Sequence, residues 1–288
     1  MHIHAMPHFM HPFVIPLLLL APLHGGGNVL PTRSLLVDLD ASKGLEMEAG
    51  NHVARWTSEV GGKRFEFVKQ DAGRSEPGSG RPTLLAKVPA LGGKPALVFL
   101  QQELVCADEV AFDTLTTGAG HTWAAVIAVR PQRVGVKDVN SFFGNLKNGG
   151  FYEGLWGCVT DDNRPWYGAR NGLSFGRFDA NNPQLLAPPL VPGAFHILIG
   201  RMQAGTGTAK IDFYVDSEKP AATGVIPVNP AANPSRLAIG QERDAVEHPG
   251  TESFDGEIAR FLIWQRPLDD VEILKMIVTL RQEYHLAE

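Results

Sequence analysis

Short apolar or alternating runs, separated by clusters of glycine, proline, asparagine and aspartate, follow one another from Ser34 onward. This pattern is typical of many β-strands joined by turns. Nine runs have the length and β-rich composition of strands: residues 34–40, 64–69, 95–100, 121–130, 150–159, 194–202, 209–215, 236–240 and 256–264. Helical periodicity is almost absent among them, so the pattern predicts an all-β domain.

One of these runs is apolar on both faces. In residues 121–130 (HTWAAVIAVR), Trp123 and Ile127 share one face, while Ala124 and Val126 make the other face apolar too. A strand with this composition is typically buried on both sides. We expect it near the middle of a sheet.

The end of the chain predicts the one convincing helix, over residues 269–283. Asp269 is suited to be its N-cap, and Glu272 follows three residues later, as in a capping box. The apolar stripe expected to pack on the β domain contains Val271, Leu274 and Val278.

The N-terminal segment differs from the rest of the chain. Its apolar run, residues 13–23 (FVIPLLLLAPL), is shorter than the about 20 residues of a membrane span, but it fits the core of an export signal. Residues 1–27 are therefore predicted to be a signal peptide, and residues 28–288 a single secreted domain. No second apolar run is long enough for a membrane span, so we expect none in the mature chain.

The charge of the chain limits its partners. The formal net charge is −5, and the sequence has no run of basic residues. Nucleic-acid binding depends on clustered lysine and arginine, so we expect no nucleic-acid partner. Two cysteines, Cys106 and Cys158, permit one disulfide in an exported chain, and the sequence leaves that pairing open.

Residues 254–273 (FDGEIARFLIWQRPLDDVEI) resemble the closing strand and terminal helix of the laminin-G-like, concanavalin A-like lectin–glucanase family in its secreted bacterial form. The matching positions are Phe254, Gly256, Ile258, Trp264, Arg266, Pro267, Leu268 and Glu272, with further matches at 35–42 (LLVDLDAS), 53–56 (VARW) and 94–99 (KPALVF). The resemblance covers nearly all of the mature chain. It implies a two-sheet jelly-roll β-sandwich with a short C-terminal helix.

Two departures from the family concern calcium. Leu100, Gln101 and Gln102 stand where the family commonly has Asp-Gly and a further acidic residue, and Arg260 replaces the usual acidic residue of the last strand. Calcium remains the one cofactor that the sequence suggests, but these departures weaken the case for inheriting it from the family.

Residues 151–167 are the richest candidate for a ligand-binding surface, because aromatic faces beside carboxylates and amides suit a sugar ring. The predicted ligand-binding residues are Tyr152, Trp156, Asp162, Asn163, Arg164, Trp166 and Tyr167. For Trp156 the alternative of a core position is favoured, since it lies in an expected strand, and for Trp166 the core and the surface remain equally open.

Oxygen-bearing side chains in expected loops are candidates for a metal site. Asp161, Asp162 and Asn163 form one such cluster and Asp179, Asn181 and Asn182 another, and both suit a hard cation such as calcium. The same residue types favour turns without any metal.

Two patterns raise the question of catalysis. Asp212 and Asp216 have the spacing that sandwich glycosidases use for carboxylates on one strand, although Asp216 also reads as a turn former. The G-x-S-x-G pattern at residues 172–176 is followed by a turn-rich stretch instead of the helix that a hydrolase elbow needs, which indicates a chance match.

The leading hypothesis is a secreted, noncatalytic recognition module for glycan or another extracellular or cell-surface ligand, as the resemblance implies. The alternatives are a polysaccharide hydrolase or lyase on the same jelly roll, with Asp212 and Asp216 as weak catalytic candidates, and a structural adhesion domain. One fold hosts many functions, so the fold does not choose among them.

We expect the export signal to be cleaved between Ala21 and Leu30, because the apolar run is followed by small residues at 25–27. Mass spectrometry of the protein secreted by an expressing cell checks the position. Secreted protein that retains Met1 would contradict the prediction.

Overall fold

The computed structural model describes residues 29–72, 80–108, 110–132, 137, 139–147, 151–173, 179–241 and 252–287. The predicted export signal and residues 174–176 of the G-x-S-x-G pattern lie outside these ranges. The described part contains seventeen strands and one α-helix, so the all-β prediction with a C-terminal helix is confirmed.

In chain order the strands are β1 (Leu35–Asp40), β2 (Leu45–Glu48), β3 (His52–Val60), β4 (Lys63–Lys69), β5 (Thr83–Leu85), β6 (Ala96–Leu100), β7 (Leu104–Cys106), β8 (His121–Val129), β9 (Asn140–Gly144), β10 (Glu153–Val159), β11 (Pro165–Asn171), β12 (Gln184–Leu186), β13 (Phe195–Met202), β14 (Thr208–Val215), β15 (Ala222–Pro227), β16 (Ala238–Ile239) and β17 (Asp255–Trp264). The helix is α1 (Asp270–Tyr284), and three single 3-10 turns are η1 (Ala49–Asn51), η2 (Pro89–Leu91) and η3 (Asp113–Leu115). Each of the nine predicted runs overlaps one of these strands, with ends that differ by no more than three residues.

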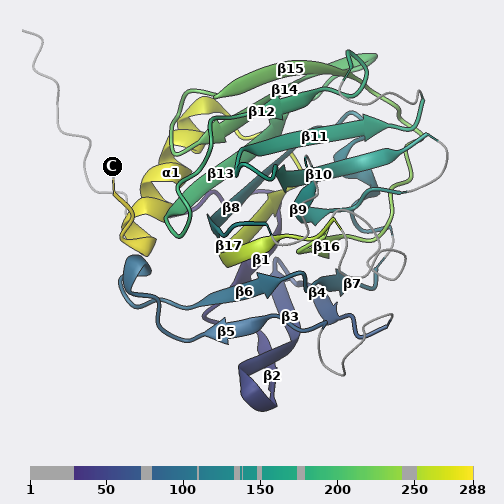
Figure 1. The fold of residues 1–288 in the computed structure, drawn as a ribbon. Helices are drawn as coiled ribbons and strands as arrows, with labels where there is room; N and C mark the ends of the chain where they lie inside the picture. Colours follow the sequence, from purple (N-terminus) through teal and green to yellow (C-terminus); the bar gives the residue numbers. More distant parts are fainter. Residues whose placement is uncertain are drawn as a thin grey trace, which may run out of the picture.

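Antiparallel pairing arranges the strands in two runs (Figure 1). One run follows the order β15, β14, β13, β8 and β17, and β17 also pairs with β1 and β6. The other follows the order β12, β11, β10, β9, β16, β7, β4, β3 and β2. Strand β5 joins the runs, because it pairs with β6 and, at Thr83, with His52 of β3.

Strand β8 is buried along its whole length, which confirms the prediction for residues 121–130. Its Trp123 and Ile127 belong to the main core, where they meet side chains of the second strand run. Its Ala124 and Val126 belong to a second apolar cluster, which α1 supplies from the other side. The first strand run therefore lies between two apolar layers.

Helix α1 begins as the sequence predicts but presents a different face to the domain. Asp269 accepts a hydrogen bond from the backbone N–H of Glu272 at 2.8 Å, and the Glu272 carboxylate accepts one from the backbone N–H of Asp269 at 3.1 Å, so the capping box is confirmed. The expected stripe is wrong, since Val271 is 75% exposed and Leu274 46%. The buried stripe contains Ile273, Met276, Ile277, Leu280 and Tyr284.

The two stripes lie side by side on the helix, and the longer one is buried. From Ile273 through Leu280 to Tyr284 the buried stripe runs the length of the helix at helical spacing, so it covers more of the sheet than the shorter valine and leucine stripe. Figure 1 shows α1 against the side of the molecule that carries β13 and β14.

Cys106 and Cys158 are both buried and are not joined by a disulfide. They belong to separate side-chain clusters, Cys106 to the main core and Cys158 to a cluster with Trp156 and Trp166. Within the ranges that the structure describes, no helix is both long and apolar enough to cross a membrane.

The buried stripe of α1 predicts how two leucines of this helix differ. Leu280→Ala removes a fully buried side chain and should lower the free energy of unfolding by about 2–5 kcal/mol. Leu274→Ala, the matched control on the outer face, should change it by less than about 0.5 kcal/mol. Urea unfolding measures both values, and equal effects of the two substitutions would contradict the docking of α1.

Candidate functional site

The predicted cluster Asp161, Asp162 and Asn163 forms the turn between β10 and β11. The backbone N–H of Thr160 donates to the Arg164 carbonyl at 3.0 Å, which closes the hairpin after the Val159 and Pro165 pair. Asn163 takes a positive φ of 62° that asparagine tolerates. A tight turn thus fixes this segment.

Three predicted residues of this segment line an open pocket of about 340 Å³. The lining of this turn pocket consists of Lys137, Thr160, Asp161, Asp162, Arg164, Gln184 and Leu186. The Arg164 Nε donates to the carbonyl of Ala187 at 3.1 Å, which holds the guanidinium against the segment after β12. Asp161, Asp162 and Arg164 are therefore brought together at one opening.

The aromatic residues of the same segment point away from solvent. Trp156 is 3% exposed, Trp166 and Tyr167 are fully buried, and the two indole rings pack edge to face with centroids 5.6 Å apart. Tyr152 is half-buried, and the Arg170 guanidinium lies 5.3 Å from the centroid of its ring. The expectation that Trp166 and Tyr167 stack on a ligand is corrected, because both faces of β11 are covered: Trp166 packs with Leu146, Trp156 and Cys158, and Tyr167 packs in the main core.

Tyr167 takes part in a polar chain with His121, and both side chains are fully buried. Its hydroxyl lies 2.8 Å from Nε2 of His121, and Nδ1 of His121 lies 2.7 Å from the carbonyl oxygen of Leu115. A carbonyl can only accept, so Nδ1 carries the proton and Nε2 accepts from the tyrosine. Burial lowers the pKa of His121 to about 4, so the ring is neutral at physiological pH.

The oxygen-rich loops have turn contacts of their own. Asp162 accepts from the Thr160 hydroxyl. Asp179 accepts from the backbone N–H groups of Asn181 and Asn182 at 2.9 and 3.0 Å, as in an Asx turn. Across the described ranges, no three His, Cys, Asp or Glu side chains are grouped to hold a metal ion. The calcium site stays a prediction that these contacts do not support.

The two carboxylates of the catalytic alternative are already bound by other residues. Asp212 is fully buried, receives hydrogen bonds from Arg201 at 3.0 and 3.3 Å, and lies 2.8 Å from the Lys210 ammonium. Asp216 lies 2.6 Å from Nδ1 of His196 and accepts from the backbone N–H of Ile197 at 2.7 Å. Both therefore serve to join β13 and β14.

An opening larger than the turn pocket lies elsewhere, on the outer face of β2, β3 and β4. This β2–β4 groove has a volume of about 460 Å³, and its lining consists of Asp38, Lys43, Gly44, Leu45, Glu46, Arg55, Thr57, Glu59 and Arg64. Successive side chains of a strand point to opposite faces. Arg55, Thr57 and Glu59 therefore face the groove, while Trp56 and Ser58 between them are fully buried.

Two glycine features shape the groove. Gly61 and Gly62 form the two-residue turn between β3 and β4, both with positive φ, which aligns the two strands as a hairpin. At Gly44 a Cβ would lie 2.4 Å from the Thr57 carbonyl oxygen, so only glycine lets the chain pass this close to β3. The Thr57 N–H donates to the Gly44 carbonyl at 2.8 Å and fixes that approach.

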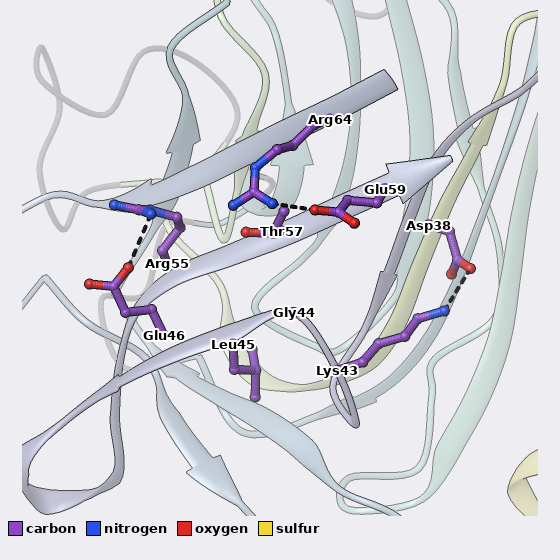
Figure 2. Close-up of a pocket in the computed structure, with 9 residues that line it drawn as sticks. All are labelled: Asp38, Lys43, Gly44, Leu45, Glu46, Arg55, Thr57, Glu59 and Arg64. Atoms are coloured by element: carbon purple, nitrogen blue, oxygen red, sulfur yellow. Dashed lines mark hydrogen bonds and ion pairs between the residues drawn. The ribbon is translucent and has the colours of Figure 1, made fainter. Parts of the chain in front are cut away.

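Opposite charges face each other across this groove (Figure 2). Arg55 pairs with Glu46 at 3.1 Å and Lys43 with Asp38 at 3.3 Å, and Arg64 is bound to Glu59. Glu46 opposite Arg55 and Glu59 opposite Arg64 are direct cross-strand neighbours. The hydrogen bond from Arg64 lowers the pKa of the adjacent Glu66, so this carboxyl is also charged at neutral pH.

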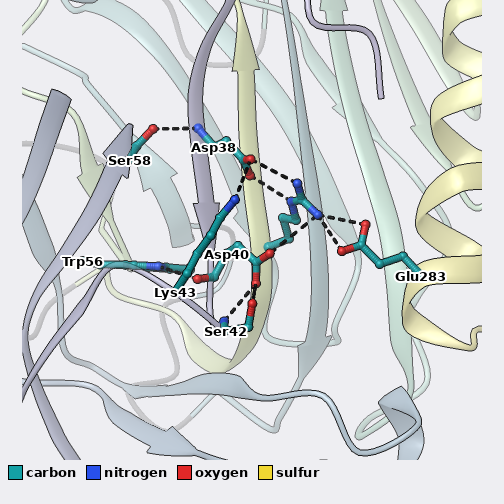
Figure 3. A network of polar contacts seen from close by, with 8 residues as sticks. Asp38, Asp40, Ser42, Lys43, Trp56, Ser58 and Glu283 are labelled. Carbon is teal, nitrogen blue, oxygen red and sulfur yellow. Dashed lines mark hydrogen bonds and ion pairs between the residues drawn. The ribbon is translucent and has the colours of Figure 1, made fainter. Parts of the chain in front are cut away.

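One end of the groove is anchored to the core of the protein by Asp38. The Arg260 guanidinium, 8% exposed, donates to both oxygens of Asp38, at 2.9 and 3.1 Å, and to both oxygens of Glu283 on α1, at 2.8 Å. The backbone N–H of Asp38 donates to the Ser58 hydroxyl at 2.8 Å (Figure 3). Asp38 is thus held by Arg260 at its carboxylate and by Ser58 at its backbone, besides its contact with Lys43.

Sequence reasoning missed the groove, although two signals for it were present. The Gly61-Gly62 pair between two β-rich runs is typical of a hairpin. The polar positions of residues 55–66 alternate with buried ones, which indicates one solvated face. The role of Asp38 and Lys43 depends on pairing between β1 and β17, which carries no local signal.

No family model and no curated protein matches the chain. Solved structures do match the chain. The sialidase of Trypanosoma rangeli in complex with 2,3-difluoro-KDN superposes with a TM-score of 0.55 at 14% sequence identity, over 96% of this chain and 37% of that chain. Its complex with the inhibitor DANA gives a TM-score of 0.54 at 14% identity, over 91% and 35% of the two chains.

The likeness shows the fold alone. This chain spans about a third of the length of the sialidase chains that it matches. At 14% identity the superposition says that the strands have a similar course, and it assigns no residue of this chain to a function.

The burial of Trp166 predicts the effect of removing it. Trp166→Ala should lower the free energy of unfolding by about 3–5 kcal/mol, because it empties a packed site beside Trp156. Phe151→Ala is the control from the same segment, and at 53% exposure it should change stability by less than about 0.5 kcal/mol. A Trp166→Ala protein of unchanged stability would place this indole at the surface.

Proposed function

We propose that this chain is a secreted, noncatalytic recognition module that binds carbohydrate or another extracellular ligand in the β2–β4 groove. The observation that carries the proposal is the set of oppositely charged side chains that the paired strands present there at neighbouring positions. Arginine offers several N–H donors and glutamate several acceptor sites, which are the groups that recognise a hydroxyl-rich ligand.

The ion pairs of the groove are suited to binding because folding depends on them little. The side chains of Arg64, Glu59 and Glu46 are each more than half exposed. Exposed ion pairs contribute little to the stability of a protein, so they can exchange partners with a ligand at small cost. The ion pairs on which folding depends more strongly lie in the interior of the protein, such as Arg260 with Asp38.

The fold and the relatives in structure agree with this proposal without deciding it. We propose that the two strand runs are the two sheets of a jelly-roll β-sandwich, and that the chain belongs to the laminin-G-like, concanavalin A-like family that residues 254–273 resemble. The matched Trypanosoma rangeli chains are sialidases, one of them in complex with sialic acid. A sugar ligand is therefore the first class to test.

The contacts of Asp212 and Asp216 favour binding over catalysis. Most glycosidases use two carboxyl groups on either side of the scissile bond, one of them able to give a proton. Asp212 is fully buried beside Arg201 and Lys210, and Asp216 is held by His196 and a backbone N–H. Secretion follows from the export signal that residues 1–27 predict, and it sets the ligand outside the cell.

A glycan array on residues 28–288, followed by calorimetry on the strongest ligand, tests the proposal. Arg55→Ala should weaken binding at least about tenfold, because it removes charge-assisted hydrogen bonds. Arg33→Ala, an exposed arginine outside both openings, should leave binding unchanged.

Arg164→Ala separates the two openings. If it abolishes binding while Arg55→Ala does not, the ligand occupies the turn pocket, and the assignment to the β2–β4 groove is wrong. If the array contains no ligand at all, the carbohydrate proposal is wrong.

A further inference from the structure

We infer that the β2–β4 groove selects uncharged saccharides and rejects acidic ones. The inference rests on the proposed carbohydrate function and adds the class of sugar. It follows from the balance of charge along the groove and from the way each charge is already paired.

The lining carries as many carboxylates as cations. The cations are Lys43, Arg55 and Arg64, and the carboxylates are Asp38, Glu46 and Glu59. Beside the lining, on the same face of the strands, Glu66 adds a further negative charge, which lies 3.5 Å from Arg55 and 2.8 Å from Arg64. Each arginine of the groove is thus shared between two carboxylates, and the groove has no excess of positive charge.

An acidic ligand would meet a penalty in this groove. To reach Arg55, its carboxylate or sulfate would have to displace Glu46 or Glu66, and the displaced side chain would remain beside the new anion. Like charges brought together in a binding site oppose binding and serve to exclude a wrong partner. The same holds at Arg64, which has Glu59 and Glu66 as partners.

A hydroxyl group fits the same place without displacing either charge. It can accept a hydrogen bond from a guanidinium N–H and at the same time donate its own proton to the neighbouring carboxylate. Both bonds are assisted by a charge, which makes them stronger than bonds between neutral groups. The pairs Arg55 with Glu46, Arg64 with Glu59 and Lys43 with Asp38 repeat this arrangement along the groove (Figure 2).

The rest of the lining also suits an uncharged sugar. Leu45 is half-buried and packs against the main core, and Thr57 lies on β3 between Arg55 and Glu59. Their aliphatic carbons can contact the C–H groups of a sugar ring. No aromatic residue is among those that line the groove, so hydrogen bonds to hydroxyls carry most of the selectivity.

One end of the groove is rigid, which makes the selection sharper. Asp38 is held by Arg260 and by Ser58, so its carboxylate cannot swing away from an incoming anion (Figure 3). A fixed acceptor favours a ligand that donates and disfavours one that carries negative charge.

A matched pair of ligands tests the inference: an oligouronide and its carboxyl-reduced form, in which an uncharged hydroxymethyl group replaces each carboxylate. The reduced form should bind at least about tenfold more tightly, and its affinity should change little between about 50 and 500 mM salt, because no net charge is brought together. The folded wild-type protein of residues 28–288 is used for both titrations.

A second experiment uses a variant with two substitutions in the groove. The variant with both Glu46→Gln and Glu59→Gln has an excess of positive charge in the groove and keeps the side-chain shapes. Its preference for the reduced form over the acid should be smaller or reversed. Its affinity for the acid should decrease as the salt concentration rises. Glu218→Gln, an exposed residue of a distant turn, is the control and should keep the wild-type preference.

The outcomes separate this inference from the proposal on which it rests. Tighter binding of the reduced form, lost in the double variant, supports it. Equal or tighter binding of the acid by the wild-type protein overturns the inference and leaves carbohydrate binding standing. If neither oligosaccharide nor any member of the glycan array binds, the proposed function itself is overturned.

Discussion

Strand β8 must have both of its faces covered by apolar side chains, and the rest of the structure depends on meeting that demand. On one face Trp123 lies among Phe142, Phe143, Tyr167 and Phe213, with ring centroids 4.9 to 6.0 Å away. Those rings come from the second strand run and from β14. The neighbouring strand β13 leaves room for the Trp123 indole at Gly200, where a Cβ would lie 2.1 Å from the Trp123 Nε1. On the other face the cover is α1, so the helix is part of the core and not an appendage.

The helix that covers β8 is also held by charge, and that charge extends to the groove. Arg260 on β17 is nearly buried, and a buried cation is tolerated only with partners that satisfy its hydrogen bonds. Asp38 of β1 and Glu283 of α1 supply them. Desolvation by burial opposes the charge of Arg260, but the attraction of Asp38 and Glu283 raises its pKa overall, so the ion is kept. The contact that closes one side of the core therefore also positions one end of the β2–β4 groove.

A feature of the structure could be predicted from the sequence when residues close together in the chain determine it. The nine strands with strong apolar runs and the capping box of α1 were predicted, since each depends on residues that are neighbours in the sequence. Short or polar strands such as β2 and β12 were missed, because pairing with neighbours forms them. The face of α1 was wrong, since docking on β8 and β17 chooses between two adjacent stripes. Trp166 could not be placed, because its burial follows from packing against Leu146, Trp156 and Cys158, which its own run of sequence does not show. The groove joins residues from Asp38 to Arg64 across strands, which no single run reveals.

The two ways in which this protein uses charge explain where a ligand can bind. Asp212 with Arg201, and Asp38 with Arg260, lie in the interior, where removing one partner would strand a desolvated ion. Such pairs cannot exchange partners with a ligand. The ion pairs of Arg55 and Arg64 are exposed to water. Water weakens the attraction within each pair, so a ligand group can bind between the two partners. Because Arg55 and Arg64 are each shared between two carboxylates, a group that enters must be able both to donate and to accept, which a hydroxyl can do and an anion cannot.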